Sequence, residues 1–504
     1  MEFQFEPVTC EFLQEVLFAP ISQEETGETI VPDSCPDVER VLDAFGSVVL
    51  RGKECRSGSA SISGGVHAGV LYAPEDHSAP RTLHYYIPFT IRVDNSALTE
   101  QSQISVDCRV RSADARILNS RKVMVRVNLC GSVTGYEPAT QELYHPEPDQ
   151  TGDLQLKPAT YPVLRALATA EKPFSISEEV ELPGGSPMRE LCRSQMSTDI
   201  VESRIVGNKG VFKGNVSLRL LYLTEEGELC PWSCQLPFSQ YVEFDKEYED
   251  QELQVKLAVT DLTVEDANGQ GRRLLAELQM LAQCTALGQE ELEIVEDAFS
   301  LRHAFTPEWK ELNAAGRLDR QRQSEVVRAA VQAPRVKSVV DTQVFLDEPV
   351  ARREGETVKI VAPMTASVLY RDEEGELQGA ATRMEAACQT ELAENCTCRP
   401  GACISGEAFA VPAGDGLEVR CTVDFTLDSL SAGALKTLCG GKIGDEPLPE
   451  EERPSVILRP AAPEDTLWSL AKQCRTTMAS IRDANVLGED EAVLSGMLLI
   501  PIVK

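Results

Sequence analysis

The chain has 504 residues, a formal net charge of −32 and 16 cysteines. This length accommodates several domains, and a hydrophobic fraction of 42% is sufficient to give each of them a core. The strongly negative charge repels phosphate backbones, and no Lys/Arg cluster overrides it, so nucleic acid is excluded as a partner.

The start of the chain and its hydropathy bear on location. The first seven residues are acidic, whereas a secretory signal peptide has a basic segment followed by an apolar run. No stretch contains the roughly 18 apolar residues that a membrane-spanning helix requires. We therefore expect a cytoplasmic protein without membrane insertion.

An internal repeat is the most informative feature of the sequence. A segment ending in two hydrophobic residues and a tyrosine occurs at Val66–Tyr72, Val216–Tyr222 and Met364–Tyr370, with the tyrosines 150 and 148 residues apart. Glu-Glu-Gly-Glu-Leu follows the second and third copies at 225–229 and 373–377. Glycine after such a run is typical of a hairpin turn, because it adopts positive φ angles without steric cost. We predict three repeats of one fold.

Alternating hydrophobicity predicts the fold class. Hydrophobic residues occupy every second position in 123–129 and 419–427, which is the pattern of half-buried antiparallel strands. Residues 308–331 have a more helical composition, and we expect this segment to join the second and third repeats. The sequence therefore predicts a mainly β protein with three tandem β-sandwich-like repeats.

These observations also suggest boundaries. An acidic, proline-rich stretch that begins near residue 441 is typical of an extended tether before a further module. We assign residues 1–140 to the first repeat, 141–172 to a connection, 173–300 to the second repeat, 301–332 to a second connection, 333–440 to a divergent third repeat, 441–454 to the tether and 455–504 to the terminal module.

The cysteines lie mainly in alternating strand patterns, where cysteine behaves as a small buried hydrophobe. Without an export signal, reduced thiols are expected rather than a disulfide framework. Cys388, Cys396, Cys398 and Cys403 form the densest group, a weak candidate for a zinc or other soft-metal site. Their spacing lacks the paired Cys-x2-Cys knuckles of such sites, so we expect no metal and no cofactor.

The last 50 residues have a different pattern. A short strand at 456–458 is followed by a helix that Asp465 or Thr466 can cap, and Leu467, Leu470 and Ala471 give this helix an apolar face. A second helix ends near Asn485, and a final strand runs up to Pro501. The expected order is therefore strand, helix, helix, strand.

This terminal module resembles the LysM domain in Asp-Thr-Leu-Trp-Ser-Leu-Ala at 465–471, in Asn485, and in Leu-Leu-Ile-Pro at 498–501. The resemblance implies a βααβ fold with a shallow groove that receives N-acetylglucosamine polymers in this family. The chain departs from the family pattern at Glu464 and Ser495, both near that groove. The candidate residues for binding a partner or glycan are Asp465, Thr466, Leu467, Asn485, Val486, Leu494, Ser495 and Gly496. The alternative is that Asp465, Thr466 and Asn485 merely cap helices.

The repeats resemble the SPOCS domain of clostridial spore-coat proteins. The shared features are a Pro-x3-Pro motif at 32–36 and 183–187, the strand ending in Leu-Tyr, and the Glu-Glu-Gly-Glu-Leu turn. Tandem SPOCS domains before one LysM domain are typical of a family of coat morphogenetic proteins. The resemblance implies a scaffold at the forespore surface of the mother cell or in the spore coat, whose LysM domain docks a SpoIVA-like coat ATPase.

Catalytic chemistry has little support in the sequence. The five histidines form no zinc-protease motif, and no nucleophile elbow, Walker loop or dinucleotide fingerprint is present. We therefore predict a non-enzymatic protein. Two alternatives remain: a peptidoglycan-binding protein of the cell wall or spore cortex, and an uncharacterised enzyme housed in the repeats.

Overall fold

The computed structural model describes residues 2–144, 153–248, 250–313, 316–393, 396–431, 433–447, 454–462, 465–488 and 496–502. Apart from the turns and two short helices close to the C-terminus, the described chain consists of antiparallel strands. This confirms the predicted fold class of a mainly β protein that ends in a small βααβ module.

Three units of similar strand order follow one another. The first contains β2 (Pro7–Ile30), β3 (Val38–Arg56), β4 (Ser59–Pro74), β5 (Arg81–Asp94), β6 (Gln103–Asn119) and β7 (Lys122–Tyr144). The second contains β8 (Leu154–Glu181), β9 (Met188–Val206), β10 (Lys209–Thr224), β11 (Leu229–Glu243), β12 (Glu252–Asp266) and β13 (Arg273–Ser300). The third contains β15 (Arg317–Val331), β16 (Val336–Leu346), β17 (Val350–Glu354), β18 (Thr357–Asp372), β19 (Leu377–Glu391), β20 (Cys396–Ala413) and β21 (Gly416–Ser431).

Each unit is a sandwich of two sheets. One sheet is independent and has the order β3-β4-β5, β9-β10-β11 or β16-β18-β19, with β17 also paired to β18. The other sheet has the order β6-β7-β2, β12-β13-β8 or β20-β21-β15, and these three are joined through β8 into one sheet. The alternating residues predict this arrangement correctly: Val123, Val125, Val127 and Leu129 on β7 are all fully buried between the two sheets.

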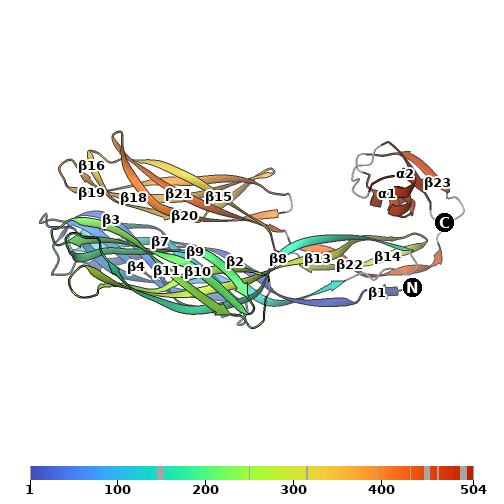
Figure 1. Ribbon diagram of the computed structural model, residues 1–504, viewed down its shortest axis with the longest axis horizontal. Coiled ribbons are helices and arrows are strands. Elements are labelled where there is room, and N and C mark those ends of the chain that lie inside the picture. Colours follow the sequence, from blue (N-terminus) through green and yellow to red (C-terminus); the bar gives the residue numbers. More distant parts are fainter. Residues whose placement is uncertain are drawn as a thin grey trace.

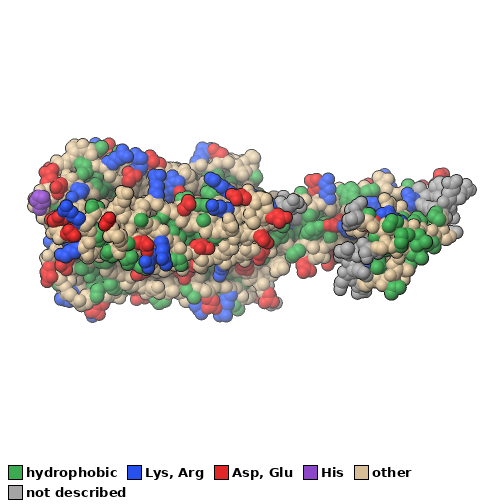
Figure 2. Space-filling model, turned by 90° about the horizontal axis from the view of Figure 1, so that it is seen from above, with side chains coloured by type: hydrophobic (Ala, Val, Ile, Leu, Met, Phe, Trp, Pro, Cys, Tyr) green, Lys and Arg blue, Asp and Glu red, His purple; other side chains and the backbone are tan. Residues whose placement is uncertain are grey.

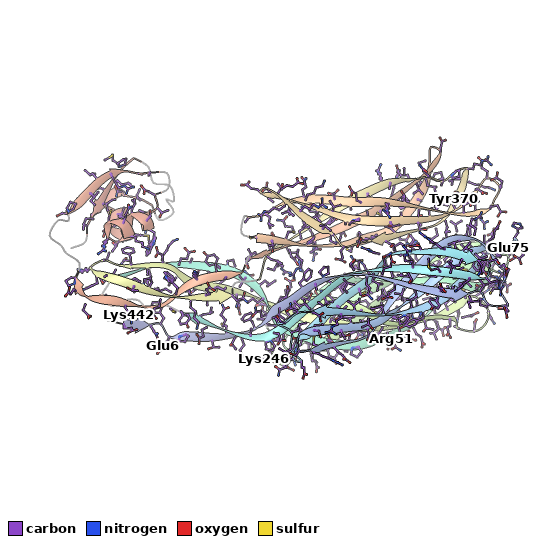
Figure 3. The ribbon with its side chains drawn as sticks, turned by 180° about the vertical axis from the view of Figure 1, so that it is seen from behind. Glu6, Arg51, Glu75, Lys246, Tyr370 and Lys442 are labelled. Carbon is purple, nitrogen blue, oxygen red and sulfur yellow. The ribbon has the colours of Figure 1, made fainter. Side chains whose placement is uncertain are left out.

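The repeated tyrosines take similar positions. Tyr72, Tyr222 and Tyr370 lie on β4, β10 and β18, the central strands of the three independent sheets. All three side chains are buried, and Figure 3 labels Tyr370 near the end of the molecule that is distant from the helices. The spacing of the repeated segments in the sequence therefore matches the spacing of the corresponding strands in the three units.

The three units surround a common axis. Asp43 of β3, Arg193 of β9 and Asp341 of β16 are separated by the same 150 and 148 residues as the tyrosines. These three side chains, which we call the axial cluster, meet with only 3–5% of their area exposed. Arg193 Nη1 donates to Asp43 at 2.7 Å and Nη2 donates to Asp341. One position of each unit therefore contributes to a single buried ion cluster.

Around this axis, each unit contacts the other two. Arg81 of β5 pairs with Glu190 of β9 at 2.8 Å, and Ser233 of β11 donates to Glu407 of β20 at 2.6 Å. Arg40 of β3 donates to the carbonyl of Leu377 on β19 at 3.1 Å, which joins the third unit to the first. The three sandwiches thus form a closed head with approximate threefold symmetry.

A narrow stalk leaves the head (Figure 1). It consists of the ends of the β2–β7 and β8–β13 ribbons together with β1 (Glu2–Gln4), β14 (His303–Asn313) and β22 (Ala434–Pro447). Leu143, Val163, Leu292 and Leu312 are buried inside it, so the stalk has its own small core. Glu6 and Lys442 mark the stalk in Figure 3, and Lys246 marks its junction with the head.

Several segments expected as connections are strands. The helical expectation for residues 308–331 is wrong, because β14 and β15 occupy this segment and pair with β22 and β21. Residues 154–172 belong to β8, and residues 441–447 of the expected tether belong to β22. Residues 145–152 and 448–453 lie outside the described part of the chain. Long-range pairing overrides helix propensity here: β14 pairs with β22 in the stalk, and β15 pairs with β21 in the third sandwich.

Candidate partner-binding site

The C-terminal module contains β23 (Val456–Pro460), α1 (Leu467–Cys474), α2 (Met478–Asn485) and β24 (Met497–Pro501). The sequence determines where the helices begin and end. Thr466 caps α1 in a capping box with Ser469, and Thr477 caps α2. Leu470, Ile481, Leu498 and Ile500 are almost fully buried and pack the helices against one face of the two-stranded sheet.

The polar candidate residues are engaged within the module. Asp465 accepts a hydrogen bond from Arg459 at 2.6 Å and another from the amide of Ala462 at 2.8 Å. Asn485 donates to the carbonyl oxygens of Ile481 and Leu499, at 2.7 and 2.6 Å, and accepts from the amide of Leu499 at 2.7 Å. These side chains therefore join the turns to the strands.

The remaining candidates differ in exposure. Val486 follows α2 in the left-handed region with φ 56°, and 91% of its surface is exposed. Leu467 is half-buried and packs on the module core. The carbonyl of Gly496 accepts from Ala461 at 2.9 Å, which places this turn beside the Asp465 turn. Leu494 and Ser495 lie outside the described residues.

Sequence reasoning missed a second apolar surface on the module. The outward face of the sheet carries Val456, Leu458 and Pro460 on β23, opposite Pro501, Leu499 and Met497 on β24. Leu458 is 64% exposed and Met497 is 62% exposed. We call these six residues the outer sheet face, and hydrophobic side chains are concentrated at this end of the molecule in Figure 2. Apart from Arg459, both strands are apolar at odd and even positions, and this pattern is the signal that predicts two apolar faces.

The module is docked on the tip of the stalk through α1. The Trp468 ring packs edge-on against Phe299 of β13 with 5.1 Å between ring centroids, and its Nε1–H donates to Asp297 at 2.9 Å. Lys472 donates to both oxygens of Asp297, at 2.6 and 2.7 Å. Trp468 is only 9% exposed. The outer sheet face is not part of this contact.

The cysteine group does not converge. Cys396 and Cys398 pack against the core of the third unit, whereas Cys403 has the opposite parity on β20 and is exposed. Burial raises the pKa of Cys388 to about 11, which disfavours the thiolate that binds metal. Within the described ranges, no group of three or more His, Cys, Asp or Glu side chains is arranged to hold a metal ion.

Membrane insertion through helices has no support in the described residues, because α1 and α2 have eight residues each and no longer helix occurs there.

Comparison with known families agrees with this architecture. A family model described as the SipL SPOCS domain matches residues 37–118 and 187–265, which coincide with β3–β6 and β9–β12. A LysM domain model matches residues 462–500. Neither a curated protein nor a solved structure gives a significant match.

The fold and these matches define a sporulation-related protein that combines SPOCS sandwiches with a C-terminal LysM domain, two non-catalytic binding domain types. This domain content matches that of a SipL-type protein. The third unit, β15–β21, lies outside the SPOCS matches but has the corresponding strand order.

Proposed function

We propose that this protein is a non-enzymatic scaffold of spore-coat assembly. Its LysM module docks a protein, a coat morphogenetic ATPase of the SpoIVA type, in the mother cell at the forespore surface. The three repeats form the rigid body that carries the module.

The hydrogen bonding and the exposure of the module's residues are the observation that supports protein binding. Asp465 and Asn485 use their polar atoms on neighbouring strands and turns, so they offer little to the hydroxyl groups of a sugar. In contrast, Val486, Leu458 and Met497 are exposed aliphatic side chains. Contiguous exposed apolar groups are typical of protein contacts, whereas a glycan requires polar or aromatic partners.

Peptidoglycan is the second candidate ligand. The match to the LysM domain favours it, because the domain type binds peptidoglycan in other proteins. The two candidates make opposite predictions for the exposed aliphatic residues.

We expect Val486→Asp or Leu458→Asp in the full chain to abolish co-purification of the coat ATPase, because a buried carboxylate without a partner is strongly disfavoured at an interface. Both positions are exposed, so each variant should fold with its thermal unfolding temperature unchanged within error. Val326→Asp is the control, since Val326 lies on the head and its exposure of 66% is close to the 64% of Leu458.

Sedimentation with purified peptidoglycan separates the two candidates. Sedimentation of the wild-type chain with the glycan, together with undisturbed ATPase binding by both aspartate variants, would refute the proposal. Loss of ATPase binding in both aspartate variants, with no sedimentation, would support it.

A further inference from the structure

A cavity of about 510 Å³ lies where the three units meet, close to the junction of the head and the stalk. Its walls come from the jointly built sheet, with contributions from β2, β6, β8, β12, β15 and β20. The lining includes the apolar side chains of Phe12, Leu164 and Leu287. This volume is typical of pockets that bind small molecules.

The carboxylates that line the cavity are all paired with arginine. Glu15 binds Arg399 through both oxygens, at 2.5 and 2.9 Å, and Asp428 binds Arg320 in the same way, at 2.6 and 2.9 Å. The other two, Asp107 and Glu348, both lie against Arg109, at 3.3 and 2.7 Å. The acidic residues are therefore directed to neighbouring arginines, although the buried Oε1 of Glu348 lies 2.7 Å from Arg109 without a well-formed hydrogen bond.

Cationic donors remain in excess in the same cavity. Among the described residues Lys256 of β12 has no ion pair, and its Nζ makes one long hydrogen bond of 3.4 Å to Thr134. The buried Nη1 of Arg317 and the buried Nε of Arg165 have no hydrogen-bond partner among the described residues. These two arginines also line the cavity, although other atoms of each pair with Glu252 and Glu290.

Buried donors without acceptors are costly, and a cation next to them favours an acidic ligand. Removal from water lowers the pKa of Lys256, and Arg399 acts in the same direction, whereas the nearby carboxylates Asp107, Glu15 and Glu348 act against it. An anion bound beside Lys256 would satisfy its ammonium group and offset this cost.

We propose that the cavity is a binding site for a small organic anion, whose carboxylate or phosphate oxygens meet Lys256 and whose apolar body lies against Phe12 and Leu164. The site belongs to the head and does not depend on the ligand of the LysM module. It is formed by all three units, so its occupation favours the closed arrangement around the axis.

Phthalate is a suitable probe, because it carries two carboxylates on an apolar ring. We expect the unfolding temperature of the full chain to rise progressively with phthalate concentration. Phthalamide, the neutral diamide analogue, and KCl at matched ionic strength should have no such effect. Inorganic phosphate should act more weakly, because it lacks the apolar body.

Lys256→Met should weaken the phthalate response about 10-fold or more, as expected for a lost charge-assisted hydrogen bond. Without ligand this variant should be at least as stable as the wild type, because it removes a half-buried charge that has no partner. Lys246→Met is the control, since Lys246 does not line the cavity and pairs with Glu11. Figure 3 labels Lys246 at the junction of the head and the stalk.

Lys256→Gln, which retains a polar group, provides a second variant if the methionine variant fails to fold. The proposal is overturned if phthalate does not raise the unfolding temperature of the wild type, or if both Lys256 variants keep the full response. A phosphate effect as large as that of phthalate would exclude the organic ligand class.

Discussion

Replacement of Arg193 by methionine is expected to lower the free energy of unfolding of the head by about 3–5 kcal/mol, the cost of breaking a buried ion pair from one side. The substitution leaves Asp43 and Asp341 buried, with 3% and 5% of their side-chain area exposed. Ser367 still donates to Asp43 and Arg219 to Asp341, but the positive charge of Arg193 between the two carboxylates is lost. Urea-induced unfolding at neutral pH measures the loss.

The same variant has a defined dependence on pH. Burial raises the pKa of Asp43, and Arg193 and the hydrogen bond from Ser367 oppose this effect. Without Arg193 the pKa in the folded state rises further above its unfolded value. A raised acid pKa costs stability above the folded pKa, and this cost disappears as the pH falls to the unfolded pKa. The deficit of the variant should therefore be smaller at about pH 5 than at about pH 7.

Arg204→Met is the control for both experiments. Arg204 lies on the same strand, is 62% exposed and forms only a long surface pair of 3.7 Å with Glu202. Surface pairs of this kind contribute little, so we expect a change within about 0.5 kcal/mol. An Arg193→Met variant as stable as this control would show that the axial cluster does not hold the units together.

Replacement of Trp468 by alanine is expected to cost the LysM module about 3–5 kcal/mol, as for other buried tryptophans. The ring packs between the module core and Phe299, and the substitution also removes the hydrogen bond to Asp297. So small a module has little stability to lose. We therefore expect it to be largely unfolded at 37 °C while the head stays intact.

Hydrogen exchange resolved by segment measures this effect. Amides of α1 and α2 should lose protection in Trp468→Ala, and those of β7 and β10 should retain it. Trp309→Ala is the control, because Trp309 lies on β14 of the stalk and is 40% exposed. Retained protection in α1 would show that the module core does not depend on this ring.

The sequence by itself determined which local structures form and that they repeat. Alternating residues such as Val123, Val125 and Val127 specify a strand buried on one face, since the period of two is a property of the strand itself. Thr466 and Thr477 specify the helix starts in the same local way, through side-chain bonds to nearby amides. The 150- and 148-residue spacing of the tyrosines is likewise visible without a structure.

Only the tertiary structure decided which strands pair and which distant side chains meet. The 308–331 segment forms strands because its partners, β21 and β22, lie about a hundred residues further along the chain, beyond the reach of local propensity. Asp43, Arg193 and Asp341 meet only when three units close around one axis, and Lys256 faces a cavity only in that arrangement. For Asp465 and Asn485 the sequence left capping and binding equally open. Their hydrogen-bond partners include Arg459 and Leu499, which only folding brings within reach.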